Sequence, residues 1–277
     1  MSSMSRPFSL GPWLLHRFPR NRTMARITRA YLSWYRSDNN VWADSNGEFE
    51  LLSIIAPTCR VVLDVGANVG DWSREVLKVS PSVSIHCFEA APDNHATLVQ
   101  SDLAGRAILN HVAVSNQDGE ITLNLFGENS PLNSIVTPAG SQSDAHSRSI
   151  VVRAISIDNY IAGLGLSHVD FVKIDVEGAE MYVLEGMKSS LRQGLIDAVQ
   201  FEYGPFSIYA RTFMKDFFEE FNMLGFTMYK ISQPKMMKFE QYSETMDNFS
   251  HQNWVAVRHG SEIARLVSKH SIVGKPL

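Results

Sequence analysis

From residue 58 onward, short apolar runs alternate with stretches that have helical spacing. The apolar runs are rich in β-branched residues, as strands are. The stretches between them repeat apolar residues every three or four positions, which is typical of amphipathic helices. The core strands are predicted at residues 60–67, 83–90, 107–115, 169–178 and 195–204, with two closing strands at 226–232 and 253–258. Strands that alternate with helices indicate a doubly wound, mostly parallel α/β sheet.

Three segments depart from this alternation. Residues 118–126 follow an Asp-Gly turn signal and alternate apolar with polar side chains, which predicts a half-exposed antiparallel strand. The two closing strands have no helix between them, so we expect an antiparallel hairpin at one edge of the sheet. Residues 127–149 are rich in Ser, Asn, Pro and Gly and predict a long loop, a kind of segment that often forms a lid. A strand and a helix follow this loop, with Asp158 as the expected N-cap.

A chain of 277 residues is long enough for one large α/β domain with a buried core. We place this domain at residues 45–260, between an N-terminal extension (1–44) and a C-terminal tail (261–277). The sequence contains no run of eighteen apolar residues, so no membrane-spanning helix is expected. Its two cysteines form no spaced framework, which favours a reducing compartment such as the cytoplasm over a secreted scaffold, and argues against a zinc site.

The net charge of −4 conceals an uneven distribution. The first 37 residues carry seven arginines and no acid, which leaves 18 of the 25 basic residues against all 29 acidic ones in the rest of the chain. An acidic main body argues against nucleic acid as a partner, because nucleic-acid binding needs clustered positive charge. From Asn21 to Arg36, apolar side chains recur at helical spacing and arginines share another face, so we expect an amphipathic helix.

Three interpretations of this basic segment remain open. The helix packs its apolar stripe on the main domain, or it makes a peripheral contact with an anionic membrane surface. Alternatively, the segment is an organelle presequence, because residues 1–20 are rich in Arg and Ser and free of acids, although their cleavage signature is poor. A secretory signal is not expected, because the apolar stretch is too short.

A glycine turn and a distant acid indicate a nucleoside site. The turn DVGANVG (64–70) ends the first strand and opens a helix, and Gly66 and Gly70 allow a ligand to approach the backbone. Glu89 ends the second strand, where a carboxylate can accept the hydroxyls of a ribose. The glycine spacing differs from the G-x-G-x-x-G of dinucleotide sites, and Asp64 would repel a pyrophosphate but suits an ammonium group. S-adenosylmethionine is therefore favoured over NAD, and a tight turn that binds no ligand is the alternative.

Five motifs then point to a known family. VVLDVGANVGDWS, FEAAPDN, VAVSNQDGEITL, VKIDVEGAE and NWVAVR occur in the order seen in FkbM-like methyltransferases, and the chain resembles that family over residues 45–258. The resemblance implies a seven-stranded, Rossmann-like class I methyltransferase sheet. It also implies S-adenosylmethionine as cofactor and methyl transfer to a hydroxyl oxygen of a sugar or natural product. The residues on the cofactor motif are Asp64, Gly66, Asn68, Gly70 and Glu89, and we add Ala67 and Ala113 to the predicted cofactor site.

The stretch VKIDVEGAE (172–180) places several ionisable side chains at the end of a strand that reads as buried. Strand alternation puts Lys173 and Asp175 on one face, and Glu202, near the end of the following strand, is an expected neighbour. A structural ion-pair cluster is one interpretation, because charges at such positions are costly without partners. An acceptor site is the other, because ligands of open α/β sheets bind outside the carboxyl ends of the strands.

Methyl transfer to oxygen requires an aligned acceptor and a base for the hydroxyl proton. The candidate catalytic residues are Asp175, Glu177 and Glu202, and the same carboxylates are alternative ligands for a divalent cation. His251 is a second candidate base, and Ser134 in the long loop is expected to line the acceptor pocket. The sequence thus predicts an O-methyltransferase for a hydroxylated small molecule or glycan. A cofactor-binding scaffold without catalysis and an NAD-dependent oxidoreductase are the alternatives.

Overall fold

The computed structural model describes residues 20–127, 129–136 and 148–274. Residues 1–19, with their presequence-like composition, and most of the predicted loop at 127–149 lie outside this range. The chain divides after Asp38 into two compact units, and each is described by itself.

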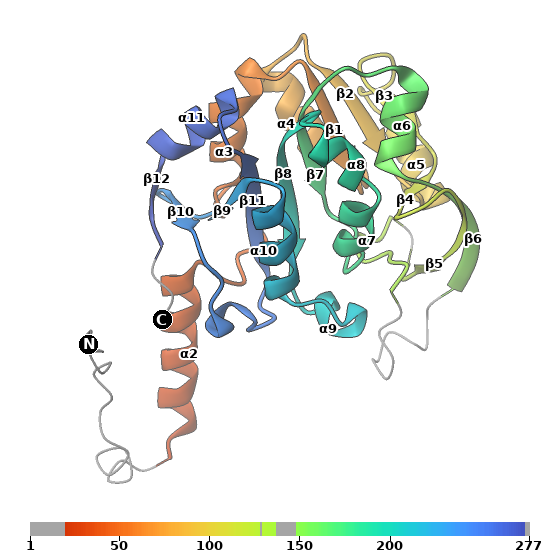
Figure 1. Cartoon of the computed structure of the whole chain (residues 1–277). Helices are drawn as coiled ribbons and strands as arrows, with labels where there is room; N and C mark the ends of the chain where they lie inside the picture. Colours follow the sequence, from red (N-terminus) through yellow and green to blue (C-terminus); the bar gives the residue numbers. More distant parts are fainter. Residues whose placement is uncertain (1–19, 128, 137–147, 275–277) are drawn as a thin grey trace. The chain divides into compact units, whose positions relative to one another are not determined.

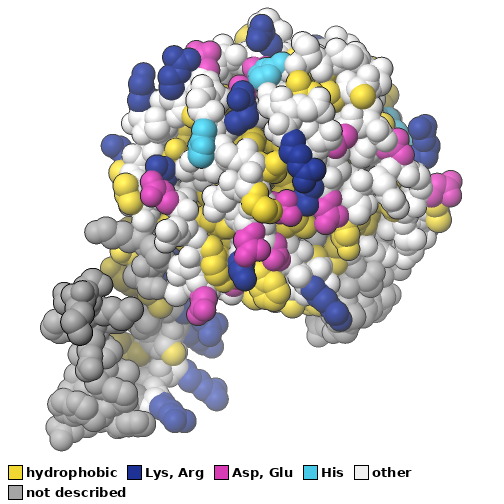
Figure 2. All heavy atoms as spheres, viewed as in Figure 1, with side chains coloured by type: hydrophobic (Ala, Val, Ile, Leu, Met, Phe, Trp, Pro, Cys, Tyr) yellow, Lys and Arg dark blue, Asp and Glu magenta, His cyan; other side chains and the backbone are white. Residues whose placement is uncertain are grey.

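The first unit contains the predicted amphipathic helix, α2 (Arg22–Arg36). The side chain of Asn21 caps its start by accepting hydrogen bonds from the backbone N–H groups of Thr23 and Met24. The helix has no buried residue, and its apolar side chains include Met24 at 59% exposure and Trp34 at 74%. Arginine side chains project from the same helix into solvent (Figure 2). The existence of this helix is confirmed, whereas its partner stays a prediction.

The second unit is built on one nine-stranded sheet (Figure 1). Its strand order is β12-β10-β9-β11-β8-β7-β1-β2-β3, and the five strands from β8 to β3 are parallel. In chain order the strands are β1 (Val61–Val65), β2 (Ser84–Phe88), β3 (Ile108–Asn110), β7 (Val169–Ile174), β8 (Ile196–Tyr203), β9 (Phe226–Lys230), β10 (Met236–Phe239), β11 (Gln252–Arg258) and β12 (Ser271–Val273). The predicted doubly wound, mostly parallel α/β sheet is confirmed.

The edge of this sheet differs from the predicted hairpin. Strands β9 and β11 do pair antiparallel, but β11 lies between β8 and β9. Strands β10 and β12 then continue the sheet beyond β9, so that a seven-stranded core carries two additional short strands. The segment expected to be a C-terminal tail therefore contributes a strand. It also contributes helix α11 (Glu262–Lys269), whose Ile263 and Val267 are buried in the core.

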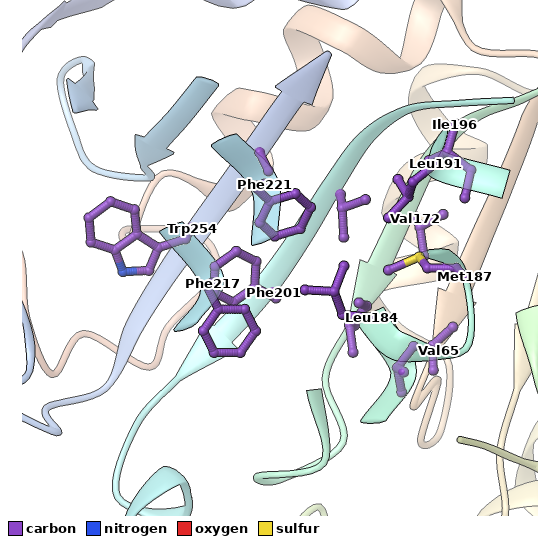
Figure 3. Close-up of a cluster of buried hydrophobic side chains, with 14 of the residues drawn as sticks. Val65, Val172, Leu184, Met187, Leu191, Ile196, Phe201, Phe217, Phe221 and Trp254 are labelled. Carbon is purple, nitrogen blue, oxygen red and sulfur yellow. The ribbon is translucent and has the colours of Figure 1, made fainter. Parts of the chain in front are cut away.

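Helices cover both faces of the sheet, as the alternation along its strands requires. In chain order they are α3 (Glu48–Ile55), α4 (Asp71–Val79), α5 (Pro92–Val99), α6 (Ile157–Leu164), α7 (Glu180–Glu185), α8 (Lys188–Arg192), α9 (Phe206–Ala210) and α10 (Met214–Met223), followed by α11. Val62 and Phe171 pack in one core cluster with α3, α4 and α11. Leu63 and Val172, their neighbours along the strands, pack in the other cluster with α6, α7, α8 and α10. Figure 3 shows this second cluster, where Phe201 of β8 stacks on Phe217 of α10 at 4.3 Å between ring centroids.

The second unit also contains a three-stranded sheet, β4-β6-β5. This sheet and the cap of the helix that follows it differ in two respects from the sequence-based expectations. The third predicted strand is split, because β3 ends at Asn110 and β4 (Ala113–Val114) pairs instead with β6 (Arg148–Ile155). The predicted antiparallel strand is confirmed as β5 (Gly119–Leu125), which pairs with β6. Helix α6 is capped by Ser156 and not by Asp158. The Asp158 carboxylate instead accepts hydrogen bonds from the backbone of Ser189 and Ser190, which joins α6 to α8.

Candidate functional site

The turn between β1 and α4 passes very close to the end of β7. Gly66 has φ +83°, and a Cβ atom there would lie 1.8 Å from the carbonyl oxygen of Asp175. Only glycine fits this approach. Gly70 has φ +90°, and a Cβ there would lie 2.3 Å from the Leu103 side chain, so this glycine serves packing. Asn68 between them also has a positive φ, +48°. The backbone conformation of this turn is therefore determined by packing against Asp175 and Leu103 as well as by any ligand.

Glu89 is fixed beside this turn. One of its carboxylate oxygens accepts the backbone N–H of Asn68 at 2.8 Å, and the other accepts that of Ala91 at 2.7 Å. Burial raises the pKa of Glu89 to about 7, although the two backbone hydrogen bonds act in the opposite direction. Each oxygen of a carboxylate has a second lone pair, so Glu89 can still accept hydroxyl groups from a ligand.

A first cavity opens at Glu89. Four residues of the predicted cofactor site line it: Gly66, Asn68, Glu89 and Ala113. Phe88 of β2 and five of the residues at 130–135 form further parts of the wall. The side-chain oxygen of Asn68 is buried without a hydrogen-bond partner among the described residues. Such an atom marks a place where a ligand donor belongs, because unpaired buried polar atoms are rare in folded proteins.

A second cavity lies next to the first and shares Gly66, Asn68 and Asp175 with it. It includes Ala67 of the predicted cofactor site. The side chains that give it its chemistry are Glu48, Trp72, Lys173, Asp175, Glu202 and His251. The indole N–H of Trp72 is buried and has no hydrogen-bond partner among the described residues. The two cavities thus meet where β1 and β7 end, at the carboxyl edge of the parallel strands.

Asp64 is placed differently from our expectation. Its side chain is completely buried, accepts a hydrogen bond from the Ser73 hydroxyl at 2.5 Å, and lines neither cavity. Burial raises the pKa of Asp64. The charge of Lys173, whose Nζ lies 3.8 Å from an Asp64 oxygen, lowers the pKa but does not outweigh burial. An ammonium group of a ligand in either cavity would not meet this carboxylate, because Asp64 faces the interior beneath α4.

Lys173 links Asp64 to the cavity. Its Nζ lies 2.9 Å from Asp175 and 5.7 Å from the centre of the Trp72 ring. Burial alone would lower the pKa of Lys173, but the charges of Asp175 and Asp64 outweigh it and raise the pKa. The predicted proximity of Lys173 to Asp175 is therefore observed, and it commits one oxygen of Asp175 to an ion pair.

The acids after β7 have separate positions. Glu177, at φ +51°, lines neither cavity, although its carbonyl accepts the Ser134 hydroxyl at 2.6 Å. Burial and the charges of Glu202 and Asp175 raise the pKa of Glu177 to about 10. Glu180 begins α7, and its carboxylate accepts the backbone N–H groups of Val176 and Gly178. Ser134 lies in the wall of the first cavity, not in the second.

Glu202 and His251 form a close pair in the second cavity. The Nε2 atom of His251 lies 3.0 Å from Oε1 of Glu202. Burial raises the pKa of Glu202, although its hydrogen bond with His251 opposes this. Burial alone would lower the pKa of His251, but the hydrogen bond and charge of Glu202 outweigh it and raise the pKa.

The donor atoms of Asp175, Glu177 and Glu202 do not converge on one point. In the part of the chain that the structure describes, the one group of three such residues close enough to share a metal ion is His168, Asp170 and Asp197. That group lies at the opposite, amino ends of β7 and β8, and its acids are already bonded to Arg258 and to the backbone at Arg60 and Val61.

Two residues that line the second cavity, Glu48 and Trp72, were not predicted from the sequence. Glu48, at the start of α3, is buried and accepts hydrogen bonds from Gln200 and Asn253, 152 and 205 residues away. Trp72, in the first turn of α4, reads as an ordinary core residue. No local signal distinguishes either of them, because only the packing of α3 and α4 on the sheet brings them to the cavity.

The family assignment rests on a match over most of the second unit. A family model described as "Methyltransferase FkbM domain" matches residues 64–256. The chain belongs to the FkbM methyltransferase family. A relative named 2-O-methyltransferase NoeI, from Sinorhizobium fredii, is 28% identical over 51% of this chain and 63% of its own length. The hexuronic acid methyltransferase AglP of Haloferax volcanii is 27% identical over 57% of this chain and 64% of its own. The chain therefore spans somewhat less than two thirds of each of these relatives.

Solved structures resemble this FkbM-family chain only distantly. A TehB-like SAM-dependent methyltransferase from Corynebacterium glutamicum is 10% identical, with a TM-score of 0.41, over 85% of this chain and 98% of its own. The sheet of this chain has the mostly parallel, doubly wound order with an antiparallel part that the family resemblance implied. S-adenosylmethionine is the cofactor implied by the match to a methyltransferase family. The first cavity offers features that fit it: an acid for ribose hydroxyls, a glycine where the backbone is closely approached, and the unpaired oxygen of Asn68.

Proposed function

We propose that this protein is an S-adenosylmethionine-dependent O-methyltransferase that modifies a hydroxyl group of a sugar, glycan or natural product. One observation carries the proposal. Two adjoining cavities meet at Gly66, Asn68 and Asp175, and they differ in chemistry. The first has Glu89, an acid suited to a ribose, and the second holds several ionisable side chains suited to moving a proton. A methyltransferase needs both, side by side.

The first cavity is assigned to the cofactor, which supplies an electrophilic methyl group when it is bound. Glu89 accepts the ribose hydroxyls, and Ala113 lies in the apolar part of the wall. The backbone at Gly66 and Ala67 leaves room for the part of the cofactor that reaches the second cavity. Gly70 and Asp64 act indirectly, because Gly70 seats the turn on Leu103 and Asp64 holds Lys173 in place.

The second cavity is assigned to the acceptor. Removing a proton from an aliphatic hydroxyl requires a base in contact with it, and Asp175 and Glu202 both line this cavity. Glu177 lines neither cavity but belongs to the same electrostatic cluster, because burial and then the charges of Glu202 and Asp175 raise its pKa. We assign the three acids to the acceptor site as a group.

The experiment is a direct assay for product. The full chain is incubated with S-adenosylmethionine and a panel of methyl glycosides, and S-adenosylhomocysteine is quantified by mass spectrometry. We expect acceptor-dependent S-adenosylhomocysteine together with a mass gain of one methylene on a glycoside. A chain that binds the cofactor by calorimetry but forms no product with any hydroxylated acceptor would instead be a cofactor-binding scaffold.

We further propose that α2 contacts an anionic membrane surface and that the protein works in the cytoplasm. Six large apolar side chains of α2 are exposed, and the helix carries arginines but no acid: Met24, Ile27, Tyr31, Leu32, Trp34 and Tyr35. Such a helix gains apolar burial and charge attraction at an anionic lipid interface. In the described part of the chain, no helix is long and apolar enough to cross a membrane. Both cysteines are buried and unpaired, which agrees with a reducing compartment.

A further inference from the structure

The pairing of β8 with β11 brings together a histidine and an acid that stand 49 positions apart. Glu202 lies opposite Asn253 in the antiparallel ladder, and His251 immediately precedes β11. Two backbone hydrogen bonds with Asn39 hold His251, one from its N–H to the Asn39 side chain and one to its carbonyl. The ring is therefore anchored on both sides, by its main chain and by the 3.0 Å contact between Nε2 and Glu202.

This contact decides which ring nitrogen carries the proton in neutral His251. An ionised carboxylate can only accept, so Nε2 must be the protonated nitrogen that donates to Glu202. The lone pair of neutral His251 then resides on Nδ1. That atom is buried and has no hydrogen-bond partner among the described residues. A buried acceptor without a partner is unfavourable by itself, and its presence in a ligand cavity indicates a group that arrives with the ligand.

Asp175 is less well placed for this task. Its carboxylate already pairs with Lys173, which in turn is needed to compensate the buried Asp64. A proton taken up by Asp175 would weaken that ion pair. A proton taken up by His251 instead creates an imidazolium next to Glu202, which the carboxylate stabilises. The charged groups that act on His251 are Glu202, Asp175 and Glu48, and Asp175 in turn pairs with Lys173.

We propose that His251 is the general base of the methyl transfer and that Glu202 is its positioning residue. This inference rests on the proposed function. The hydroxyl proton of the acceptor passes to Nδ1 of His251, and the acceptor oxygen uses its electron pair to form the bond to the methyl carbon. The bond from that carbon to sulfur breaks, its electron pair remains on sulfur, and S-adenosylhomocysteine leaves. The imidazolium then returns its proton to solvent.

A first test needs no acceptor. Nitrogen-15 NMR of the full chain, with the His251 signals assigned by their loss in His251→Gln, reports the tautomer of the neutral ring and its pKa. We expect the Nε2–H tautomer and a pKa above the ordinary histidine value. Glu202→Gln should lower that pKa, because it removes the charge that raises it. A neutral His251 protonated on Nδ1 would overturn the proposal, whether or not the protein proves to be a methyltransferase.

A second test uses the methyl glycoside that the wild-type protein methylates fastest. His251→Gln should lower kcat about 10²- to 10⁴-fold while cofactor affinity by calorimetry is unchanged. In His251→Ala, added imidazole should restore part of the rate, and Glu202→Gln should shift the rising limb of the pH–rate profile to lower pH. His259→Gln, at the other end of β11, is the matched control and should behave as wild type. A His251→Gln variant with wild-type kcat would assign the proton to another group, whereas a wild-type chain that fails to bind S-adenosylmethionine would refute the proposed function itself.

Discussion

Glu89 is the side chain on which the cofactor assignment depends most. It is 7% exposed and bonded to the backbone of the glycine turn, so it cannot turn away from the first cavity. We expect Glu89→Gln to weaken S-adenosylmethionine binding by roughly 10-fold or more, because a neutral amide replaces a charged acceptor. Calorimetry measures the affinity, and Glu120→Gln on the exposed strand β5 is the control. An unchanged dissociation constant in Glu89→Gln would remove Glu89 from the cofactor site.

The raised pKa of Glu89 adds a pH dependence to the same measurement. With a pKa of about 7, Glu89 is mostly protonated at pH 6 and mostly ionised at pH 8. Only the ionised form accepts with both oxygens, so cofactor affinity should rise between these pH values in the wild type and stay flat in Glu89→Gln. A wild-type affinity that falls over this range would contradict the assignment.

At the scale of elements, the β1–α4 turn depends on the close approach of β7. Gly66→Ala would place a Cβ atom 1.8 Å from a backbone oxygen and should lower the free energy of unfolding by more than about 2 kcal/mol. Gly105 is a matched control, because it has φ +77° with no atom within 4 Å of the added Cβ. Gly105→Ala should cost about 1 kcal/mol from backbone strain alone. Urea unfolding of both variants checks this. Equal losses of the free energy of unfolding would show that glycine is needed at residue 66 for its positive φ and not for the close approach of Asp175.

Helix α2 provides a prediction about an element by itself. The full chain should co-sediment with phosphatidylcholine vesicles that contain phosphatidylserine, and much less with vesicles that lack it. Deleting residues 1–37 should abolish this binding, and replacing Arg26 and Arg29 by Gln should weaken it and reduce its dependence on salt. If the deletion instead lowers the melting temperature of the main domain and vesicle binding is absent, the apolar face of α2 packs on the protein.

For the whole molecule, cofactor binding should be visible as stability. A ligand that binds only the folded state stabilises it by about 2.7 kcal/mol at a hundred times its dissociation constant. S-adenosylmethionine should therefore raise the melting temperature by several degrees, whereas NAD should leave it unchanged. Differential scanning fluorimetry compares the two nucleosides. A shift with NAD alone would favour an oxidoreductase and contradict the methyltransferase assignment.

The local pattern of this sequence was sufficient for the parallel core of the fold. Strand and helix periodicities are local properties, and the glycine turn and Glu89 follow strand ends, so their meeting at one edge of the sheet could be predicted. The strands β10 and β12 were not predicted, because short strands at an edge have too few residues to show a period. The helix and strand of residues 261–274 were not predicted for the same reason, since they acquire their role only by packing on α3 and pairing with β10.

The chemistry of the second cavity was decided by tertiary structure. Asp64 and Glu89 both lie at strand ends near the glycine turn, yet Asp64 points beneath α4 and Glu89 points into a cavity. The sequence by itself determined which ionisable residues exist and roughly which sheet edge they occupy. Strand alternation already placed Lys173 beside Asp175. Only the register of β8 on β11 and of β7 on β1 determined the other partners: Glu202 with His251, and Lys173 with Asp64. The physical reason is that the pKa of an ionisable group depends on neighbours a few ångströms away, and those neighbours come from distant parts of the chain.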